Sequence, residues 1–364
     1  MTERMVALLG RRDEPTDGVE EYCRYLGAAL VAHGFDLAVA RLPWAERGWS
    51  AAQRELRQNA ADWRGQWVCV QYTALAWSAR GFPRRFLSVL DVLLRGGARV
   101  AVVYHDAGPF SGSRALDKLR RAVQLRVMRG ALRRAELGIF TVPLGAISWL
   151  ESRPQNAVFI PVGANLPIDA VVATKTGKSP QGNLGVAVFG ITGGETGRKE
   201  SARIAEAIRF VAGTIGKLEL HAFGRDADDC ESVLRESLRG VPVDVQVQGV
   251  LPPEEIAREL ASADVMLFLR GAISTRRGSA IAGIACGLPV IAERGTETAG
   301  PIEEAGVVLV SADKPGEFGK ALLRVLTNAE YRAQLAERSR LAQDKYFSWT
   351  AIAARYAEEL RKTR

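Results

Sequence analysis

Short apolar runs that alternate with longer helical patterns constrain the fold of this chain most strongly. In the first half, such runs predict strands at Val6–Leu9, Leu37–Leu42, Val68–Tyr72, Val100–Tyr104, Leu137–Thr141 and Val158–Pro161. In the second half they predict strands at Leu184–Gly190, Lys217–Phe223, Val243–Gln248, Val265–Leu269, Pro289–Ala292 and Val307–Val310. Helical patterns such as Gly18–His33 and Arg84–Arg95 lie between them. This alternation is typical of parallel sheets with helices on both faces, so we expect an α/β protein with two doubly wound, Rossmann-like domains.

The length of 364 residues also favours two domains, because one hydrophobic core rarely serves more than about 250–300 residues. We predict an N-terminal domain at residues 1–165, a linker with Pro, Gly, Ser and Lys at 166–182, and a C-terminal domain at 183–346. Ligands of such sheets bind at the carboxyl ends of the strands. With two facing domains, we expect the ligand in the cleft between them.

The composition is that of an ordinary globular protein, with 47% hydrophobic and 25% charged residues. The four cysteines, Cys23, Cys69, Cys230 and Cys286, have no paired spacing that would indicate zinc or a disulfide framework. The first apolar run is too short for a signal peptide, and no segment reaches the ~18 continuous apolar residues of a membrane span. We therefore expect a cytoplasmic protein.

The segment 264–293 predicts an anion site. An apolar strand runs into a loop that contains Arg276 and Arg277, and Gly278 and Ser279 then begin a helix of small residues that ends at Gly287-Leu288-Pro289. Unpaired amides at a helix start, the positive end of the helix dipole and two arginines together favour a phosphate or diphosphate. The alternative is an ordinary α/β unit, because helix starts of this kind are common in such folds.

Other candidate residues also follow predicted strands. Gly18 begins a helix and would allow close approach of another group, and His105 with Asp106 ends the fourth strand. Arg198 and Lys199 stand between strand and helix, where they would add to the arginine cluster. The alternatives are a structural hydrogen bond for His105 and a solvated loop for the two cations. The sequence has neither a P-loop nor a GxGxxG motif, which argues against an ATPase or a dehydrogenase.

The formal net charge of +8 belongs to the N-terminal half, since residues 1–163 hold 23 Lys and Arg against 15 Asp and Glu, while residues 164–364 hold 26 of each. The densest basic segment, Arg114–Arg134, predicts a helix with an apolar stripe of Leu116, Leu119, Val123, Val127 and Gly130-Ala131. A basic amphipathic helix can lie on an anionic membrane or bind an acidic partner, and the alternative is a solvated helix face. No nucleic-acid-binding motif accompanies the charge.

The segment Gln71–Arg85 is a candidate acceptor site. Tyr72 and Trp77 would stack on a sugar, and Arg80, Arg84 and Arg85 would bind an acidic or lipid-pyrophosphate group. The alternative is a loop that packs on the core and leaves its arginines exposed. Together with the basic helix, this segment leads to the hypothesis of a membrane-held saccharide acceptor, with the protein peripheral on the inner membrane face.

Seven segments in order resemble those of GT-B glycosyltransferases, and in particular the retaining glycosyltransferase family 4 (glycosyl transferases group 1). They cover nearly the whole chain: TDGVEEYCRYLGAALVAHGFDL, VVYHD, VFIPVGANLP (similar to "IPNGVD"), GRKES, VQGVLPPEEIARELASADVMLFL, GSAIAGIACGLPVIA (similar to "LEAMACGLPVIA") and YFSWTAIAARY. The resemblance implies a GT-B fold in which a final helix at 347–364 crosses back to the first domain.

The resemblance also implies roles for single residues. Gly18 would lie near the diphosphate of a nucleotide-sugar donor, His105 near the transferred sugar, and Arg198 and Lys199 on the phosphates. The backbone of Val250 and Leu251 would contact the base, and the amides of Gly278 and Ser279 would contact sugar and phosphate, with Ser274, Arg276 and Arg277 in the same site. His105, Arg198 and Lys199 are then the predicted catalytic residues.

The chain departs from the family at two glutamates spaced eight apart, whose positions hold Ser274 and Ala282. Ala282 removes a ribose contact, and Ser274 cannot replace a carboxylate near the sugar. We still predict a hexosyltransferase-type enzyme of polysaccharide or glycoconjugate synthesis, retaining and without metal or other cofactor. Asp226 and Asp228 have the spacing of a metal-binding DxD pair, but their position predicts helix capping. The alternatives are a non-catalytic nucleotide-sugar-binding or partner subunit and a sugar-nucleotide epimerase.

Overall fold

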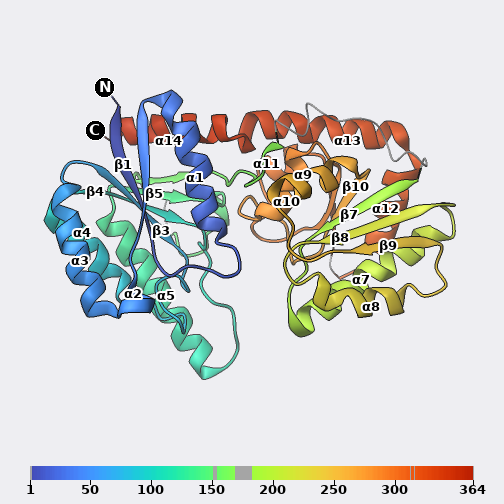
Figure 1. Cartoon of the computed structure of the whole chain (residues 1–364), viewed down its shortest axis with the longest axis horizontal. Helices are drawn as coiled ribbons and strands as arrows, with labels where there is room; N and C mark the ends of the chain where they lie inside the picture. Colours follow the sequence, from blue (N-terminus) through green and yellow to red (C-terminus); the bar gives the residue numbers. More distant parts are fainter. Residues whose placement is uncertain (1, 151–153, 169–182, 312, 315, 364) are drawn as a thin grey trace. The chain divides into compact units, whose positions relative to one another are not determined.

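The computed structural model describes residues 2–150, 154–168, 183–311, 313–314 and 316–363. The chain divides into two compact units, Met1–Val162 with Trp349–Arg364 and Gly163–Ser348, each built on its own sheet (Figure 1). We call them the N-terminal unit and the C-terminal unit. The predicted linker lies outside the described residues from position 169 onward.

The N-terminal unit has a six-stranded parallel sheet in the order β2-β1-β3-β4-β5-β6. Its strands are β1 (Glu3–Leu9), β2 (Phe35–Arg41), β3 (Trp67–Tyr72), β4 (Arg99–Tyr104), β5 (Leu137–Phe140) and β6 (Ala157–Phe159). Its helices are α1 (Gly18–Leu30), α2 (Trp44–Arg47), α3 (Trp49–Asp62), α4 (Phe86–Gly96), α5 (Ala115–Arg134) and α14 (Trp349–Lys362), with 3-10 turns at Val31–His33 and Leu144–Ala146.

The C-terminal unit repeats this plan with the order β12-β11-β10-β7-β8-β9, again all parallel. Its strands are β7 (Leu184–Phe189), β8 (Leu218–Phe223), β9 (Val243–Val247), β10 (Val265–Phe268), β11 (Val290–Glu293) and β12 (Val307–Val310). Its helices are α7 (Gly194–Ala212), α8 (Glu231–Ser237), α9 (Pro253–Ser262), α10 (Gly278–Ala285), α11 (Pro301–Glu304), α12 (Glu317–Thr327) and α13 (Ala329–Ala342), with a 3-10 turn at Asp228–Cys230 and a π-helical turn at Gln343–Phe347.

Burial explains why the strands could be found in the sequence. Every residue of β3, β5 and β10 is buried, because helices cover both faces of a parallel sheet. These strands therefore read as continuous apolar runs. The edge strand β2 is mostly exposed or half-buried and carries an aspartate and an arginine.

The final helix α14 belongs to the N-terminal unit and packs against α1. The hydroxyls of Tyr22 and Tyr356 are 2.8 Å apart in the core, and the rings of Tyr25 and Trp349 stack with centroids 5.6 Å apart. The chain thus returns to its first unit after completing the second, and the fold is GT-B. The prediction of two doubly wound domains with a returning C-terminal helix is confirmed.

One helix differs from its prediction. The apolar stripe predicted along α5 is not a continuous buried face, because Leu116 and Leu119 are 57% and 51% exposed. Burial begins at Val123 and continues through Leu132 on the inner side of the helix. Figure 1 shows the first turns of α5 extending past the neighbouring helices of this unit.

Candidate functional site

The order of strands locates the ligand edge of the C-terminal unit. From β7 the chain proceeds to β8 and β9 on one side, and from β10 it proceeds to β11 and β12 on the other, while β7 and β10 are neighbours. Ligands of open α/β sheets bind at such a switch point, beyond the carboxyl ends of the strands. The loops that follow β7 and β10 are therefore the candidate site, and both lead into helices.

The start of α10 is open to a ligand. Its N-cap residue is Arg277, whose side chain does not cap the helix. Among the described residues, the amides of Gly278 and Ser279 have no hydrogen-bond partner. A Cβ placed on Gly278 would meet nothing within 4 Å. Free amides at the positive end of a helix dipole can hold an anion.

The arginines of the loop before α10 differ in their surroundings. Arg276 is held by Glu297, with Nε 2.7 Å from Oε2. An Nη of Arg277 lies 3.8 Å from where a Cβ on Gly271 would stand, so this guanidinium lies over the beginning of the loop. The Glu297 carboxylate thus neutralises the charge of Arg276. The Arg277 guanidinium instead lies over Gly271 in the loop between β10 and α10.

The two positions that depart from the family pattern are both buried. Ser274 and Ala282 are each 1% exposed. The Ser274 hydroxyl has no hydrogen-bond partner among the described residues, and Ala282 lies within α10. Neither position presents a carboxylate to a ligand.

Arg198 and Lys199 lie inside α7 and not in the loop before it, because the helix begins at Gly194. Both side chains are exposed, and Lys199 pairs with Glu195 at 2.8 Å. The loop itself is shaped by the buried carboxylate of Glu200, which accepts hydrogen bonds from the backbone and the hydroxyl of Thr192, each at 2.7 Å. Among the described residues, neither cation makes a hydrogen bond with Arg277. Their predicted role on the phosphates stays a prediction.

The loop after β9 presents Val250 and Leu251. Val250 is 54% exposed, which is unusual for a large apolar side chain, and Leu251 is half-buried. Among the described residues, the backbone N–H and C=O of both have no partner, so they are available to a planar polar group.

Asp226 and Asp228 do not cap a helix. Asp226 has φ of 60°, and no side chain caps the 3-10 turn that follows it. The predicted capping role of Asp226 and Asp228 is therefore wrong.

Sequence reasoning missed Arg270, which lies two residues after the end of β10. Its Nη1 atom would lie 2.7 Å from a Cβ on Gly190, the residue that follows β7. Gly190 has φ of +78°, a backbone conformation that favours glycine. Arg270 thus joins the two strands of the switch point, and only the adjacency of β7 and β10 could have indicated it.

In the N-terminal unit, the helix start at Gly18 is already filled by the protein. The carboxylate of Asp17 accepts from the amides of Val19 and Glu20, both at 3.1 Å. Arg41 holds this carboxylate at 2.9 Å and also binds Glu20. The start of α1 is therefore not an open anion site, although Gly18 itself is exposed.

His105 is a neutral, hydrogen-bonded residue at the end of β4. The amide nitrogen of Gln71 donates to the Cys69 carbonyl at 3.0 Å, so its oxygen accepts from His105 Nε2 at 2.8 Å. This arrangement leaves Nδ1 as the unprotonated ring nitrogen. Burial lowers the pKa of His105 to about 4, while the charge of Asp17 acts in the opposite direction. At neutral pH the ring carries no charge, and its Nδ1 can accept a hydrogen bond from a ligand.

Two of the predicted acceptor residues are core residues. Tyr72 and Trp77 are each 1% exposed and pack against Phe86 with ring centroids 4.9 and 5.0 Å apart. The Trp77 indole donates to the Gln71 carbonyl at 2.8 Å. It thereby fixes the end of β3, whose Gln71 side chain bonds His105. These rings offer no face to a sugar. Arg80 is exposed, which the acceptor role and the alternative of a core-packed loop with exposed arginines both predict, so its role stays a prediction.

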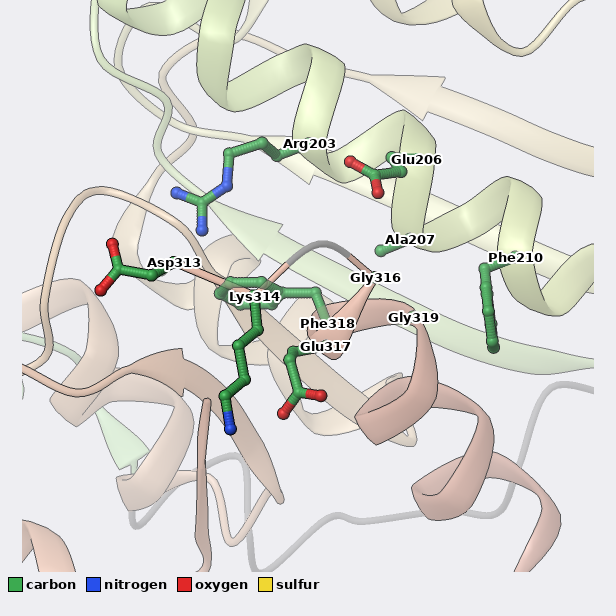
Figure 2. Close-up of a pocket in the computed structure, with 10 residues that line it drawn as sticks. All are labelled: Arg203, Glu206, Ala207, Phe210, Asp313, Lys314, Gly316, Glu317, Phe318 and Gly319. Atoms are coloured by element: carbon green, nitrogen blue, oxygen red, sulfur yellow. The ribbon is translucent and has the colours of Figure 1, made fainter. Parts of the chain in front are cut away.

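A pocket of about 230 Å³ lies elsewhere on the C-terminal unit, between α7 and the start of α12 (Figure 2). Arg203, which lines it, pairs with Glu293 at 3.2 Å and lies over the ring of Phe318 at 5.0 Å. None of the predicted donor-binding residues lines this pocket, so it is distinct from the switch-point site.

The described part of the chain has no group of His, Cys, Asp and Glu side chains placed to hold a metal ion. None of its helices combines the length and the apolar character that a membrane span needs. All four cysteines are buried and free.

Comparison with protein families gives one match, at residues 187–328, to the family described as glycosyl transferases group 1. This segment runs from β7 to the end of α12 and contains the switch-point loops. A search of curated proteins finds no match.

Solved structures of similar fold cover nearly the whole chain. The Anabaena protein HepE, solved with UDP and glucose, is 15% identical with a TM-score of 0.68, over 99% of this chain and 100% of that one. Sucrose-phosphate synthase from Thermosynechococcus elongatus is 19% identical with a TM-score of 0.68, over 99% and 98%. A putative UDP-N-acetylglucosamine 2-epimerase from Listeria monocytogenes is 14% identical with a TM-score of 0.61, over 100% and 96%. At such identities the likeness is one of fold.

Proposed function

The chain carries a domain of the glycosyl transferases group 1 family at residues 187–328, and on that premise we propose that it transfers a sugar from a nucleoside-diphosphate sugar to a saccharide or lipid-linked acceptor. Within this class we favour a hexose as the transferred group and polysaccharide or glycoconjugate synthesis as its purpose. HepE, which shares the fold, was solved with UDP and glucose, and this supports a nucleoside diphosphate as the leaving group.

The observation that carries the proposal is the open start of α10 at the switch point. Gly278 and Ser279 are the first two residues of α10, directly after Arg277, and their amides are free among the described residues. The diphosphate of the donor would accept hydrogen bonds from these amides, and the exposed backbone of Val250 and Leu251 would contact the base. Arg198 and Lys199, one turn into α7, would add positive charge near the same edge.

The reaction breaks the bond between the anomeric carbon and the diphosphate oxygen. Positive charge develops on the sugar and negative charge on the departing diphosphate, which the α10 amides and Arg277 would stabilise. The acceptor hydroxyl would attack on the face that the diphosphate leaves, and its proton would pass to a phosphate oxygen, so that configuration is retained. Retention and independence from metal both stay predictions.

His105 would act on the sugar through hydrogen bonds. Because the ring is neutral and Nε2 is occupied by Gln71, its free nitrogen is Nδ1, which can accept a hydrogen bond from a sugar hydroxyl. A neutral ring also avoids placing a positive charge beside the cationic sugar of the transition state. This favours a positioning contact for His105 over proton transfer.

We propose that the acceptor is presented at a membrane through the exposed start of α5. The side chains that form this surface, which we call the α5 surface, are Phe110, Arg114, Leu116, Lys118, Leu119 and Arg121, all of them exposed. Phe110 is 40% exposed. Exposed leucines beside cations favour the interface of an anionic bilayer, where the apolar groups insert and the cations meet lipid phosphates.

The α5 surface is continuous with the predicted acceptor loop. Arg120 donates from Nε to the Arg80 carbonyl at 3.1 Å, and its guanidinium lies 4.4 Å from the Phe110 ring centroid. The one acid in this segment, Asp117, is half-buried and 3.4 Å from Arg120. The exposed charges of the surface are therefore all positive, which fits an anionic lipid.

Vesicle co-sedimentation at low salt tests this part of the proposal. We expect binding to vesicles with anionic phospholipid and little binding to phosphatidylcholine alone. Replacing Leu116 and Leu119 by serine should weaken binding at least about tenfold, because each leucine contributes about 1.5–3 kcal/mol when fully buried. Leu341→Ser is the matched control, since Leu341 is 59% exposed on α13 of the other unit. Equal binding by the double variant and the control would contradict the assignment.

Two alternatives have support of their own. The buried Ser274 and Ala282, which lack carboxylates, favour a binding subunit without catalysis. The likeness in fold to a putative epimerase keeps a sugar-nucleotide epimerase in consideration.

Incubation of the pure protein with UDP, GDP and dTDP sugars separates these functions. A transferase releases free nucleoside diphosphate slowly, a binding subunit binds donor without turnover, and an epimerase returns an isomerised donor. The proposal requires the first result with at least one donor. Binding without release, or an isomerised donor, would contradict it.

A further inference from the structure

The Arg270 side chain lies near the carboxyl ends of both central strands of the C-terminal sheet. It follows β10, and its Nη1 lies against Gly190 at the end of β7, 2.7 Å from where a Cβ would stand. Because β7 and β10 are the strands between which the chain reverses its direction of travel across the sheet, the guanidinium lies at the switch point itself. Ligands bind at that point in open α/β sheets.

The Arg270 guanidinium has no counter-charge among the residues that the structure describes. Among the described residues it has no ion pair and no hydrogen bond from its side chain, although it is half-buried. The neighbouring arginines of the unit contrast with it, since Arg276 pairs with Glu297 and Arg203 pairs with Glu293. A partly desolvated guanidinium without a partner is unfavourable unless something else supplies the negative charge.

The missing charge fits a diphosphate. A guanidinium presents N–H groups in a planar fork that matches phosphate oxygens in bidentate fashion. Arg277 places a second guanidinium near Gly271, the residue after Arg270. The loop 270–277 therefore brings two arginines and the open start of α10 to one edge of the sheet, with glycine at 190 leaving room for the first of them.

We infer that Arg270 binds the diphosphate of the donor and stabilises it as it leaves. The inference rests on the proposed function and adds a residue that the motif pattern does not indicate. It assigns the main phosphate-binding side chain to the end of β10, whereas Arg198 and Lys199 are exposed on the second turn of α7.

Affinities of nucleoside diphosphates and of their parent nucleosides test the assignment. We would titrate wild-type protein, Arg270→Ala and Arg270→Lys with UDP, uridine, GDP and guanosine in a calorimeter. Arg270→Ala should lower the affinity for the diphosphate that wild type binds by about 10- to 100-fold, and leave the affinity for its nucleoside unchanged. Arg270→Lys should recover part of the loss, because it keeps the charge and loses the fork.

Arg239→Ala is the matched control. Arg239 is an exposed arginine of the same unit, in the turn between α8 and β9, and therefore at the opposite edge of the sheet from the switch point. It removes the same formal charge and should change neither affinity.

The outcomes separate the inference from the function on which it rests. Arg270→Ala protein that binds the diphosphate as tightly as wild type would overturn the inference alone, as would an equal loss of nucleoside and diphosphate affinity. Wild-type protein that binds no nucleoside diphosphate would overturn the proposed function together with the inference.

Discussion

The neutral state of His105 leads to a quantitative prediction. Burial lowers its pKa from the ordinary value of 6.5 to about 4 in the folded protein. As the pH falls through this interval, the unfolded chain takes up a proton before the folded chain does. The contribution of His105 to stability is therefore fully present above about pH 7 and is lost as the pH falls toward 4. The gap between the two pKa values corresponds to at most about 3 kcal/mol, of which about 2 kcal/mol is lost between pH 7 and pH 5.

Urea unfolding followed by tryptophan fluorescence measures this effect in the right part of the molecule. All seven tryptophans of the chain lie in the N-terminal unit, so the signal reports the unit that contains His105. Between pH 7 and pH 5, wild-type protein should lose about 2 kcal/mol more stability than His105→Gln. Other titrating groups contribute equally to both proteins and cancel in this comparison.

His221 provides the control. It lies in the C-terminal unit, where the hydrogen bond that its ring donates to the Glu259 carboxylate raises its pKa. Its contribution to stability is present below its unfolded pKa and is lost as the pH rises, which is the opposite direction. His221→Gln should therefore leave the tryptophan-monitored transition unchanged. A His105→Gln protein with the same pH dependence as wild type would refute the lowered pKa and the neutral state that we assign to His105.

Two further predictions concern the packing that supports the site. Tyr22→Phe and Tyr356→Phe should each cost about 1–3 kcal/mol, because each leaves the other hydroxyl buried without its 2.8 Å partner, while the double variant should be close to wild type in tryptophan-monitored unfolding; additive losses would count against this. Gly197→Ala should destabilise the C-terminal unit by about 3 kcal/mol or more, since a Cβ there would lie 1.7 Å from the Thr192 carbonyl oxygen. Thermal unfolding by circular dichroism checks it, with Gly216→Ala as the open-space control, and equal melting of the two variants would argue against the close contact.

The fold was predictable because buried strands appear in the sequence as runs of apolar residues. Each of the 12 strands in the described part of the chain overlaps an apolar run that predicted it, since helices cover the faces of a parallel sheet. The stripe on α5 shows the limit of this reasoning. Periodicity identifies an apolar face, but it does not say whether another element covers that face, and Leu116 and Leu119 are exposed in the structure.

The site was less predictable because it depends on contacts between distant segments. Tyr72 and Trp77 follow a strand as binding residues often do, yet their rings turn into the core. The start of α1 reads as an anion site until Asp17 is seen to cap it. Arg270 is one arginine among many in the sequence, and its importance appears only when β10 is found beside β7.

The central claim is that the C-terminal unit holds a nucleoside diphosphate at the carboxyl ends of β7 and β10. A crystal structure of the protein with a bound nucleoside diphosphate tests it most directly. We predict both phosphates within hydrogen-bond distance of the Gly278 or Ser279 amide and of the Arg270 guanidinium. Phosphates bound instead at the start of α1, or in the pocket lined by Arg203, would contradict the account.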